Sequence, residues 1–219
     1  MIERFDGLLL DHDGVVVTLS SMETLRGAAA GAFADVGVPD PREKDIGAIA
    51  IRVSGSELSA VADRYGVDPD RLWERREDRI ESALRSETEA GRKAPYGDVP
   101  CLEDVAVPIG IASNTQIRIV EYVLRTYDLH DLVGTVRARE PTRESLREKK
   151  PEPTYLEAAA ADLGCSNPLY VGDSESDVVA GRRAGFETVY LRRPHNRDRR
   201  LDVDPAMEMG SLCEVVDML

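Results

Sequence analysis

Short apolar runs alternate with stretches of helical spacing through the second half of the chain. The runs that we predict as strands are residues 107–112, 132–136, 168–171 and 188–191. The stretches that we predict as helices are residues 116–127, 154–163, 178–184 and 211–218. Because strands separated by helices pair in parallel through right-handed crossovers, this alternation predicts a parallel sheet with helices packed on it.

The first apolar run of the chain ends abruptly in charged residues. Leu8–Leu10 are followed by Asp11, His12, Asp13 and Gly14. A short apolar run bounded by a turn signal is typical of a fully buried parallel strand. Ligands of open α/β sheets bind at the carboxyl ends of the strands, so two carboxylates here indicate a functional site. A solvated acidic turn is the alternative interpretation.

Residues 19–92 contain no segment that resembles a strand. Helices are predicted from Ser20 or Ser21 to Val36, over residues 55–65 and over residues 70–90. A purely helical block directly after the first strand predicts an inserted cap domain at residues 19–92. The core domain would then comprise residues 1–18 and 93–219, and a helical extension of the core is the alternative. The predicted fold class is therefore α/β, with a parallel sheet core and an inserted all-helical domain.

The bulk composition is that of an ordinary globular protein. Hydrophobic residues make up 42% of the 219 positions, and no apolar run approaches the roughly 18 residues of a membrane span. The N-terminus lacks the layout of a signal peptide, so we expect a cytoplasmic protein without a membrane partner. The three cysteines are odd in number and widely separated, which predicts three reduced thiols and neither a disulfide nor a zinc site.

The charge balance is strongly acidic. A formal net charge of -13 argues against a nucleic-acid partner, since binding a phosphate backbone requires a basic face. Nearly all of the positive charge is arginine, and aspartate and glutamate together number 41. Proteins of salt-loving organisms tend to have such acidic, lysine-poor surfaces because salt screens the self-repulsion. A halophilic habitat is therefore our hypothesis.

Polar residues follow several of the predicted strands. They are Asp11 and Asp13, then Ser113 and Asn114, then Lys150 on a loop, then Asp173 and Asp177. A parallel sheet brings such strand ends to one edge, and this set of side chains suits phosphoryl transfer. One carboxylate can be a nucleophile and a second an acid and base, while Mg²⁺, lysine and a hydroxyl group hold the phosphate oxygens.

The same motifs resemble those of a known family. DxDG, Ser-Asn after the second apolar strand, Lys-Pro and GDSxxD occur in the order found in the haloacid dehalogenase (HAD) superfamily. Each motif alone is common, but the four in this order are specific. The resemblance extends from Phe5 to about Leu191 and implies a Rossmann-like core with a helical cap. Residues 95–99 are similar to the hinge that returns from such a cap.

The resemblance implies a role for each acidic residue. Asp11 would be the nucleophile that attacks phosphorus, and Asp13 would protonate the leaving oxygen and later activate water. Mg²⁺ would be bound by the Asp11 and Asp173 side chains and by the Asp13 backbone carbonyl. Asp177 would act on the metal indirectly, through a neighbouring side chain or water.

The resemblance also implies the phosphate ligands. Ser113, Asn114 and Lys150 would hold the phosphoryl group, and Lys150 would offset its repulsion from Asp11. The backbone N–H of His12 would donate to phosphate while its ring packs beside the strand. Three further sets are expected to play local roles: Thr18, Thr115 and Ser174 in loops and caps, Ser176 as a helix cap, and His130 and His195 on surfaces or loops.

The function implied is a Mg²⁺-dependent phosphatase that acts on a small phosphorylated metabolite through an aspartyl-phosphate, similar to the phosphoglycolate phosphatases. A sugar-phosphate mutase resembling β-phosphoglucomutase uses the same aspartates and is the alternative. A non-catalytic receiver or binding module is more remote, because it would leave Asp173 and Asp177 unexplained. The sequence does not identify the substrate or the oligomeric state.

Overall fold

The computed structural model describes residues 4–219 and contains a six-stranded sheet. The strand order is β3-β2-β1-β4-β5-β6, and β1 pairs in parallel with both β2 and β4. The strands are β1 (Leu8–Leu10), β2 (Ile109–Gln116), β3 (Thr135–Arg139), β4 (Leu169–Gly172), β5 (Thr188–Leu191) and β6 (Met207–Met209). The predicted α/β fold class is confirmed.

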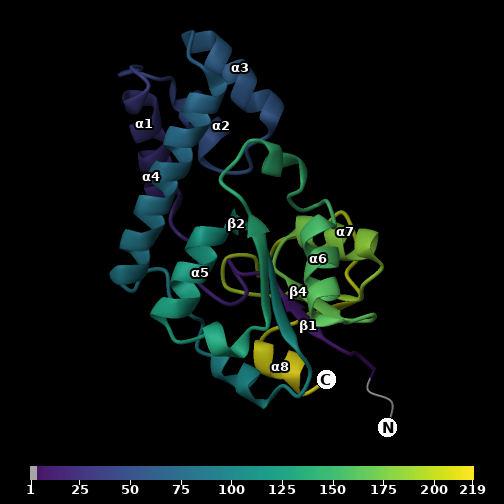
Figure 1. Cartoon of the computed structure of the whole chain (residues 1–219). Coiled ribbons are helices and arrows are strands. Elements are labelled where there is room, and N and C mark those ends of the chain that lie inside the picture. Colours follow the sequence, from purple (N-terminus) through teal and green to yellow (C-terminus); the bar gives the residue numbers. More distant parts are fainter. Residues whose placement is uncertain (1–3) are drawn as a thin grey trace. The chain divides into compact units, whose positions relative to one another are not determined.

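Helices of the sheet-bearing unit, which we call the core unit, pack on both faces of the sheet. They are α5 (Ile117–Thr126), α6 (Thr154–Leu163), α7 (Glu175–Ala184), α8 (Leu212–Val216), η1 (Val99–Asp104) and η2 (His130–Leu132). Successive leucines of β1 face opposite layers, since Leu9 joins the cluster of α6 and α7 whereas Leu10 lines a small apolar space with Leu124 of α5. Figure 1 shows α5 and α6 on opposite sides of β2. A strand buried on both faces accounts for the LLL run.

Four strands differ from the sequence prediction, β4 by one residue, since it spans Leu169–Gly172 where residues 168–171 were predicted. β2 extends through Ser113 and Asn114 to Gln116. β3 begins at Thr135, three residues later than predicted, because the apolar Leu132 and Val133 lie in and beside η2 rather than in the strand. β6 was not predicted, since its three residues are too few to show alternation.

The second unit comprises Ser20–Lys93 and Arg139–Arg147, and we call it the helical unit. Its helices are α1 (Met22–Asp35), α2 (Glu43–Ala50), α3 (Gly55–Tyr65), α4 (Pro69–Glu89) and η3 (Glu144–Arg147). Side-chain caps define most starts: Ser21 caps α1, and Ser54 and Glu57 form a capping box at α3. The sequence gives little sign of α2, because Arg42 provides no side-chain cap and Gly47 weakens the pattern. Among residues 4–219, no helix has the length and apolarity that crossing a membrane requires.

Residues 139–147 pack with the helical unit, although the sequence-based boundaries placed them in the core domain. Arg139 forms a buried ion pair with Glu77 of α4 at 2.6 Å, and Leu146 joins the hydrophobic cluster of the helical unit. The guanidinium of Arg139 also lies 5.1 Å from the centroid of the Trp73 ring. These contacts correct the predicted boundary, and a purely sequential division could not have found them.

The cysteines correct a second prediction. Cys101 of η1 and Cys213 of α8 form a disulfide with a Cα–Cα distance of 5.3 Å, so the expectation of three reduced thiols was wrong. Their separation of 112 residues hides the proximity from any local spacing rule. Cys165 is a free thiol, and its Sγ donates to the backbone carbonyl of Asp6.

Candidate active site

Polar side chains gather where the central strands end. Asp11 directly follows β1, Asp173 directly follows β4, and Ser113 lies in β2 two residues beyond Ile111, the partner of Leu10. Since β1 pairs in parallel with both of its neighbours, these three ends lie next to one another. Lys150 reaches the same edge from the loop before α6. The structure thus assembles residues that are far apart in the sequence.

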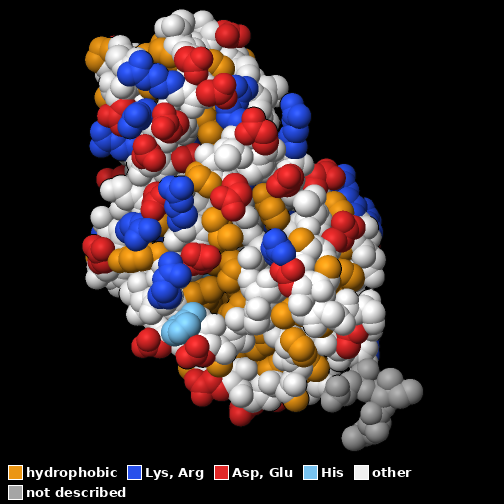
Figure 2. Space-filling view, in the orientation of Figure 1, with side chains coloured by type: hydrophobic (Ala, Val, Ile, Leu, Met, Phe, Trp, Pro, Cys, Tyr) orange, Lys and Arg blue, Asp and Glu red, His pale blue; other side chains and the backbone are white. Residues whose placement is uncertain are grey.

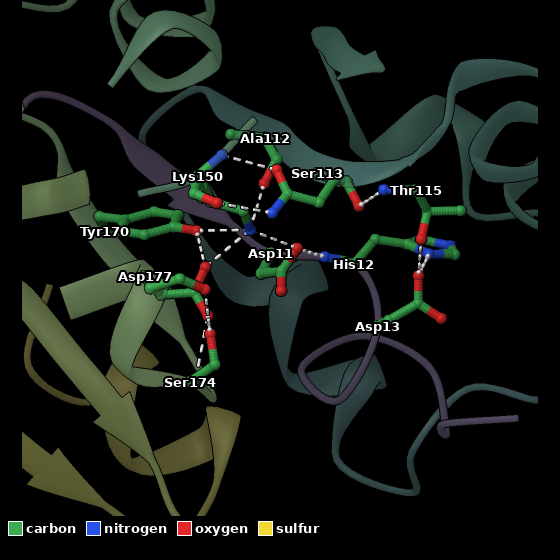
Figure 3. A network of polar contacts seen from close by, with 12 residues as sticks. Asp11, His12, Asp13, Ala112, Ser113, Thr115, Lys150, Tyr170, Ser174 and Asp177 are labelled. Carbon is green, nitrogen blue, oxygen red and sulfur yellow. Dashed lines mark hydrogen bonds and ion pairs between the residues drawn. The ribbon is translucent and has the colours of Figure 1, made fainter. Parts of the chain in front are cut away.

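Lys150 lies between two buried carboxylates. Its Nζ is 2.7 Å from Asp11 Oδ1 and 2.7 Å from Asp177 Oδ1. It also donates to the backbone carbonyl of Ala112 and to the hydroxyl of Tyr170, at 3.0 Å each (Figure 3). Four oxygen atoms therefore fix the ammonium group beside Asp11.

Asp177 is held entirely by donors of the core unit. Its Oδ1 accepts from Lys150 and from the Tyr170 hydroxyl at 2.7 Å, and its Oδ2 accepts from the backbone N–H and the hydroxyl of Ser174. Ser174, and not Ser176, is the N-cap of α7, so the prediction for Ser176 was wrong. With both oxygens engaged, Asp177 orients Lys150 rather than facing a ligand.

Asp173 places a further acid near Asp11. One carboxylate oxygen each of Asp11, Asp173 and Asp177 lies within 4.8 Å of the other two. A Cβ on Gly14 would come within 2.0 Å of Asp173 Oδ2, and Gly14 adopts a φ of +85°. Both the close approach and the left-handed backbone require glycine at the turn after Asp13.

The side chain of Asp13 is held by two neighbours. Its Oδ2 accepts from the Thr115 hydroxyl at 2.7 Å and lies 3.0 Å from Nδ1 of the buried His12 ring. Thr115, expected to satisfy local backbone groups, instead contacts the site. The His12 backbone N–H, expected to face phosphate, donates to Asp11 Oδ1 at 2.8 Å. The Asp13 side chain remains 22% exposed, so a ligand can reach it.

Asn114 holds the backbone of the lysine. Its amide oxygen accepts from the Lys150 N–H at 2.7 Å, and its Nδ2 donates to the Lys150 carbonyl at 3.1 Å. The buried Ser113 hydroxyl accepts from the backbone N–H of Thr115. Asn114 therefore positions Lys150 through its main chain, a role that the Ser-Asn motif alone did not reveal.

Burial and charge perturb the site in different directions. Burial raises the pKa of Asp11 well above its ordinary value, and repulsion from Asp177 and Asp173 adds to this despite the attraction of Lys150. Burial also raises the pKa of Asp173, with repulsion from Asp177 adding to it against the hydrogen bond from His195. Burial opposes ionisation of Asp177 as well, but Lys150 and the surrounding donors hold its pKa below the ordinary value. Asp11 is therefore the acid whose ionisation depends most on added positive charge.

The donor set fits a hard divalent cation. Asp11 Oδ2 and Asp173 Oδ1 accept no hydrogen bond from residues 4–219. Both residues belong to the cluster of acids at this edge. Mg²⁺ binds carboxylate and carbonyl oxygens of this kind. A cation here would also relieve the repulsion that raises the pKa of both acids.

Three residues of the site were missed by sequence reasoning. The Tyr170 hydroxyl bridges Lys150 and Asp177, His195 Nε2 lies 2.6 Å from Asp173 Oδ2, and Asn196 Nδ2 donates to the Asp173 carbonyl. His195 is an exposed loop residue, as expected, but the sequence did not reveal its contact with Asp173. Tyr170 looked like a core strand residue, and only the GDSxxD position beside it could have suggested a polar role.

The sheet carries two acids after β1, an acid after β4 and a lysine on the loop before α6. This is the arrangement that the resemblance to the HAD superfamily implied. A family model described as HAD-hydrolase-like matches residues 148–212. This match confirms the resemblance to the haloacid dehalogenase superfamily that the motifs carry.

Curated relatives support this assignment. A phosphoglycolate phosphatase from Neisseria meningitidis is 30% identical over 139 residues, which cover 61% of this chain and 54% of that protein. A phosphoglycolate phosphatase from Nitrosococcus oceani is 38% identical over 79 residues, or 35% of each chain. The chain spans about half the length, or less, of these relatives.

Solved structures share the fold over nearly the whole chain. CbbY from Rhodobacter sphaeroides, in complex with phosphate, has a TM-score of 0.70 at 18% identity and covers 96% of both chains. A HAD-superfamily hydrolase of subfamily IA from Geobacter sulfurreducens has a TM-score of 0.60 at 19% identity, covering 99% of this chain and 97% of that one. Similarity at this level of identity shows a common fold.

Proposed function

We propose that this protein is a phosphatase that hydrolyses a small phosphate monoester at Asp11. The observation that carries the proposal is the position of Lys150, whose ammonium group lies 2.7 Å from Asp11 Oδ1. A carboxylate that attacks a phosphate dianion needs such a fixed positive charge, because the two anions repel each other. Lys150 and the Ser113 hydroxyl would hold the phosphoryl oxygens.

In the first step, the Asp11 carboxylate attacks phosphorus and an aspartyl-phosphate forms as the ester P–O bond breaks. Asp13 gives its proton to the leaving oxygen, which departs as an alcohol. In the second step, Asp13 takes a proton from water, the resulting hydroxide attacks phosphorus, and phosphate leaves as Asp11 is regenerated. Thr115 and His12 hold Asp13 in place for both proton transfers.

Mg²⁺ is part of the proposal. The Asp11 and Asp173 side chains and the Asp13 backbone carbonyl would hold it, and Asp177 would act through Lys150. When bound, the cation neutralises charge on the transferring phosphoryl group. The same charge favours the ionised form of Asp11, against the burial that raises the pKa of this residue.

The curated relatives direct the choice of substrate. They are named phosphoglycolate phosphatases, so we propose phosphoglycolate as the first member of a substrate panel. The helical unit would select among such substrates, by analogy with capped members of the fold. A cytoplasmic location belongs to this proposal, and cell fractionation tests it.

Phosphate release from a panel of phosphorylated metabolites tests the activity, with Mg²⁺ or EDTA and at low and molar KCl. Asp11→Asn is the inactive comparison, and Asp131→Asn is a matched control, since it makes the same change at an acid of η2. We expect turnover by the wild type and the control only. Release that needs a bisphosphate primer would favour the mutase alternative, and equal rates for wild type and Asp11→Asn would refute the assignment.

A further inference from the structure

Four consecutive residues after β5, Arg193–Asn196, lie against the acidic edge of the core unit, and we call them the β5 loop. His195 Nε2 donates to Asp173 Oδ2 at 2.6 Å. The next residue, Asn196, donates from Nδ2 to the backbone carbonyl of Asp173 at 2.8 Å. The β5 loop therefore holds both the side chain and the main chain of one acid.

Asn196 makes this loop rigid. Its Nδ2 also donates to the Leu191 carbonyl at the end of β5, and its Oδ1 accepts from the backbone N–H of Arg193 at 2.7 Å. Only 2% of Asn196 is exposed to solvent. The Asn196 amide hydrogen-bonds only to main-chain groups, and these bonds hold the backbone at the neighbouring His195 in place.

Arg193 connects the same loop to the turn that carries the nucleophile. Its Nη2 donates to the Val15 carbonyl at 2.8 Å, and its two Nη atoms contact both carboxylate oxygens of Asp98. The guanidinium lies 4.0 Å from the centroid of the Tyr96 ring. Val15 is two residues beyond Asp13, so the β5 loop contacts the acidic segments after both β1 and β4.

The geometry points to His195 as a positioning residue for the cation site. Among residues 4–219, the cluster of potential ligands contains Asp11, Asp173 and Asp177 and no histidine, so His195 acts through Asp173 rather than as a ligand. Its hydrogen bond occupies one carboxylate oxygen of Asp173, and the other accepts no hydrogen bond from residues 4–219. The inference rests on the proposed Mg²⁺ site and assigns it a residue from outside the motifs.

The ring of His195 also restricts the space around this carboxylate. A Cβ on Gly14 would meet His195 Cε1 at 3.2 Å as well as Asp173 Oδ2, so the turn and the ring enclose Asp173 from two sides. A carboxylate without these partners would lose part of its fixed orientation. Removing such a hydrogen bond to a metal ligand typically weakens metal binding by about 10–100-fold.

Calorimetric titration of the metal-free protein with MgCl₂ tests this inference without using activity. His195→Ala removes the ring, His195→Leu keeps the bulk but removes the N–H, and His195→Gln keeps an N–H donor. We expect the dissociation constant for Mg²⁺ to rise about 10–100-fold in the Ala and Leu variants and to recover in large part in the Gln variant. His130→Ala, at an exposed histidine of the core unit, should match the wild type.

The outcomes separate this inference from the proposed function. Wild-type affinity in both His195→Ala and His195→Leu would overturn the role of His195 and leave the phosphatase proposal intact. Failure of the wild type to bind Mg²⁺ would contradict the proposed cation site and this inference together. In activity assays of His195→Ala and His195→Leu, we expect the Mg²⁺ concentration at half-saturation to rise while kcat at saturating Mg²⁺ stays within a few-fold of the wild type. A general loss of structure would lower kcat as well.

Discussion

Lys150 Nζ lies 2.7 Å from Asp177 Oδ1, although the Lys150 side chain is 2% exposed and the Asp177 side chain is fully buried. Water does not reach these two ions, so each depends on the charge of its partner to offset the lost hydration. Removing one partner of a buried pair leaves an unpaired charge, which typically costs about 3–5 kcal/mol of folding free energy. Lys150 has two carboxylate partners, so its loss leaves both Asp11 and Asp177 without a cation.

We therefore predict that Lys150→Met lowers the free energy of unfolding by about 3–5 kcal/mol and abolishes phosphate release. Urea denaturation at neutral pH measures the first effect. Lys149→Met removes the same type of side chain from the adjacent position and should change the stability by less than about 1 kcal/mol. Equal midpoints for the two variants would contradict a structural role for Lys150.

The two acids of the DxD motif should fail in different ways. Asp11→Asn removes the nucleophile, so turnover should vanish for every substrate. Asp13→Asn removes only the proton donor and base, so the rate should fall by about 10²–10⁴ for alkyl phosphates. For an ester with a stable leaving group, such as p-nitrophenyl phosphate, the loss should be smaller. Comparing phosphate release from the two ester types measures the difference, and near-normal rates of alkyl phosphate hydrolysis in either variant would argue against these roles.

Much of the fold could be predicted because its signals are local. Leu8–Leu10 end in acids, β5 matches its predicted bounds, and Ser21 and Gly185 mark helix ends as expected. Local signals also identified the strand-end acids that the sheet brings together. Segments without such signals, including α2 and β6, were missed or shifted.

Contacts between distant segments explain what the sequence did not reveal. His195 gains its role only because β5 lies beside β4, and no motif of the chain predicts the position of its ring. The same is true of Tyr170, an apparent core residue whose hydroxyl reaches Lys150, and of the pair Cys101 and Cys213. Such roles follow from packing between distant segments, which the spacing of residues along one segment does not reveal.

The disulfide should stabilise the core unit. It closes a loop across a separation of 112 residues between η1 and α8, and cross-links of this span restrict the unfolded chain. We expect Cys213→Ser to lower the free energy of unfolding by about 2–5 kcal/mol. Denaturation with and without a reductant measures this. The reductant should destabilise the wild type and Cys165→Ser but not Cys213→Ser, and a wild-type transition unchanged by reductant would count against the bond.

Asp98 should contribute to the loss of stability in acid. Burial opposes its ionisation, but Arg193 and the backbone N–H of Leu212 outweigh this and hold the pKa of Asp98 below its ordinary value. A depressed pKa in the folded state means that Asp98 stabilises the protein above its ordinary pKa and that this contribution is lost as the pH falls toward the folded-state value. The Asp98→Asn variant should thus be less stable than the wild type at neutral pH. It should also lose less stability than the wild type between about pH 5 and pH 3. Asp104→Asn, at an exposed neighbour in η1, controls for the change in charge, and parallel pH profiles for Asp98→Asn and wild type would exclude this contribution.

Salt should stabilise the folded protein. The sequence carries 41 acidic against 28 basic residues, and Figure 2 shows both signs interspersed on the face in view. Surface pairs such as Arg137 with Asp162 lose strength as salt rises, but each is worth about 1 kcal/mol or less. Repulsion among the excess acids acts over a Debye length of about 10 Å at 0.1 M salt and about 3 Å at 1 M, so screening relieves more repulsion than attraction.

The melting temperature should therefore rise between low and molar KCl if the halophilic hypothesis is right. The increase should be smaller in a variant that combines Glu103→Gln and Asp104→Asn, because two exposed charges of η1 are removed. A flat or falling melting temperature in the wild type would exclude the hypothesis. A rise of equal size in both proteins would trace the effect to general salting-out of apolar surface rather than to screening, because only screening depends on the net charge.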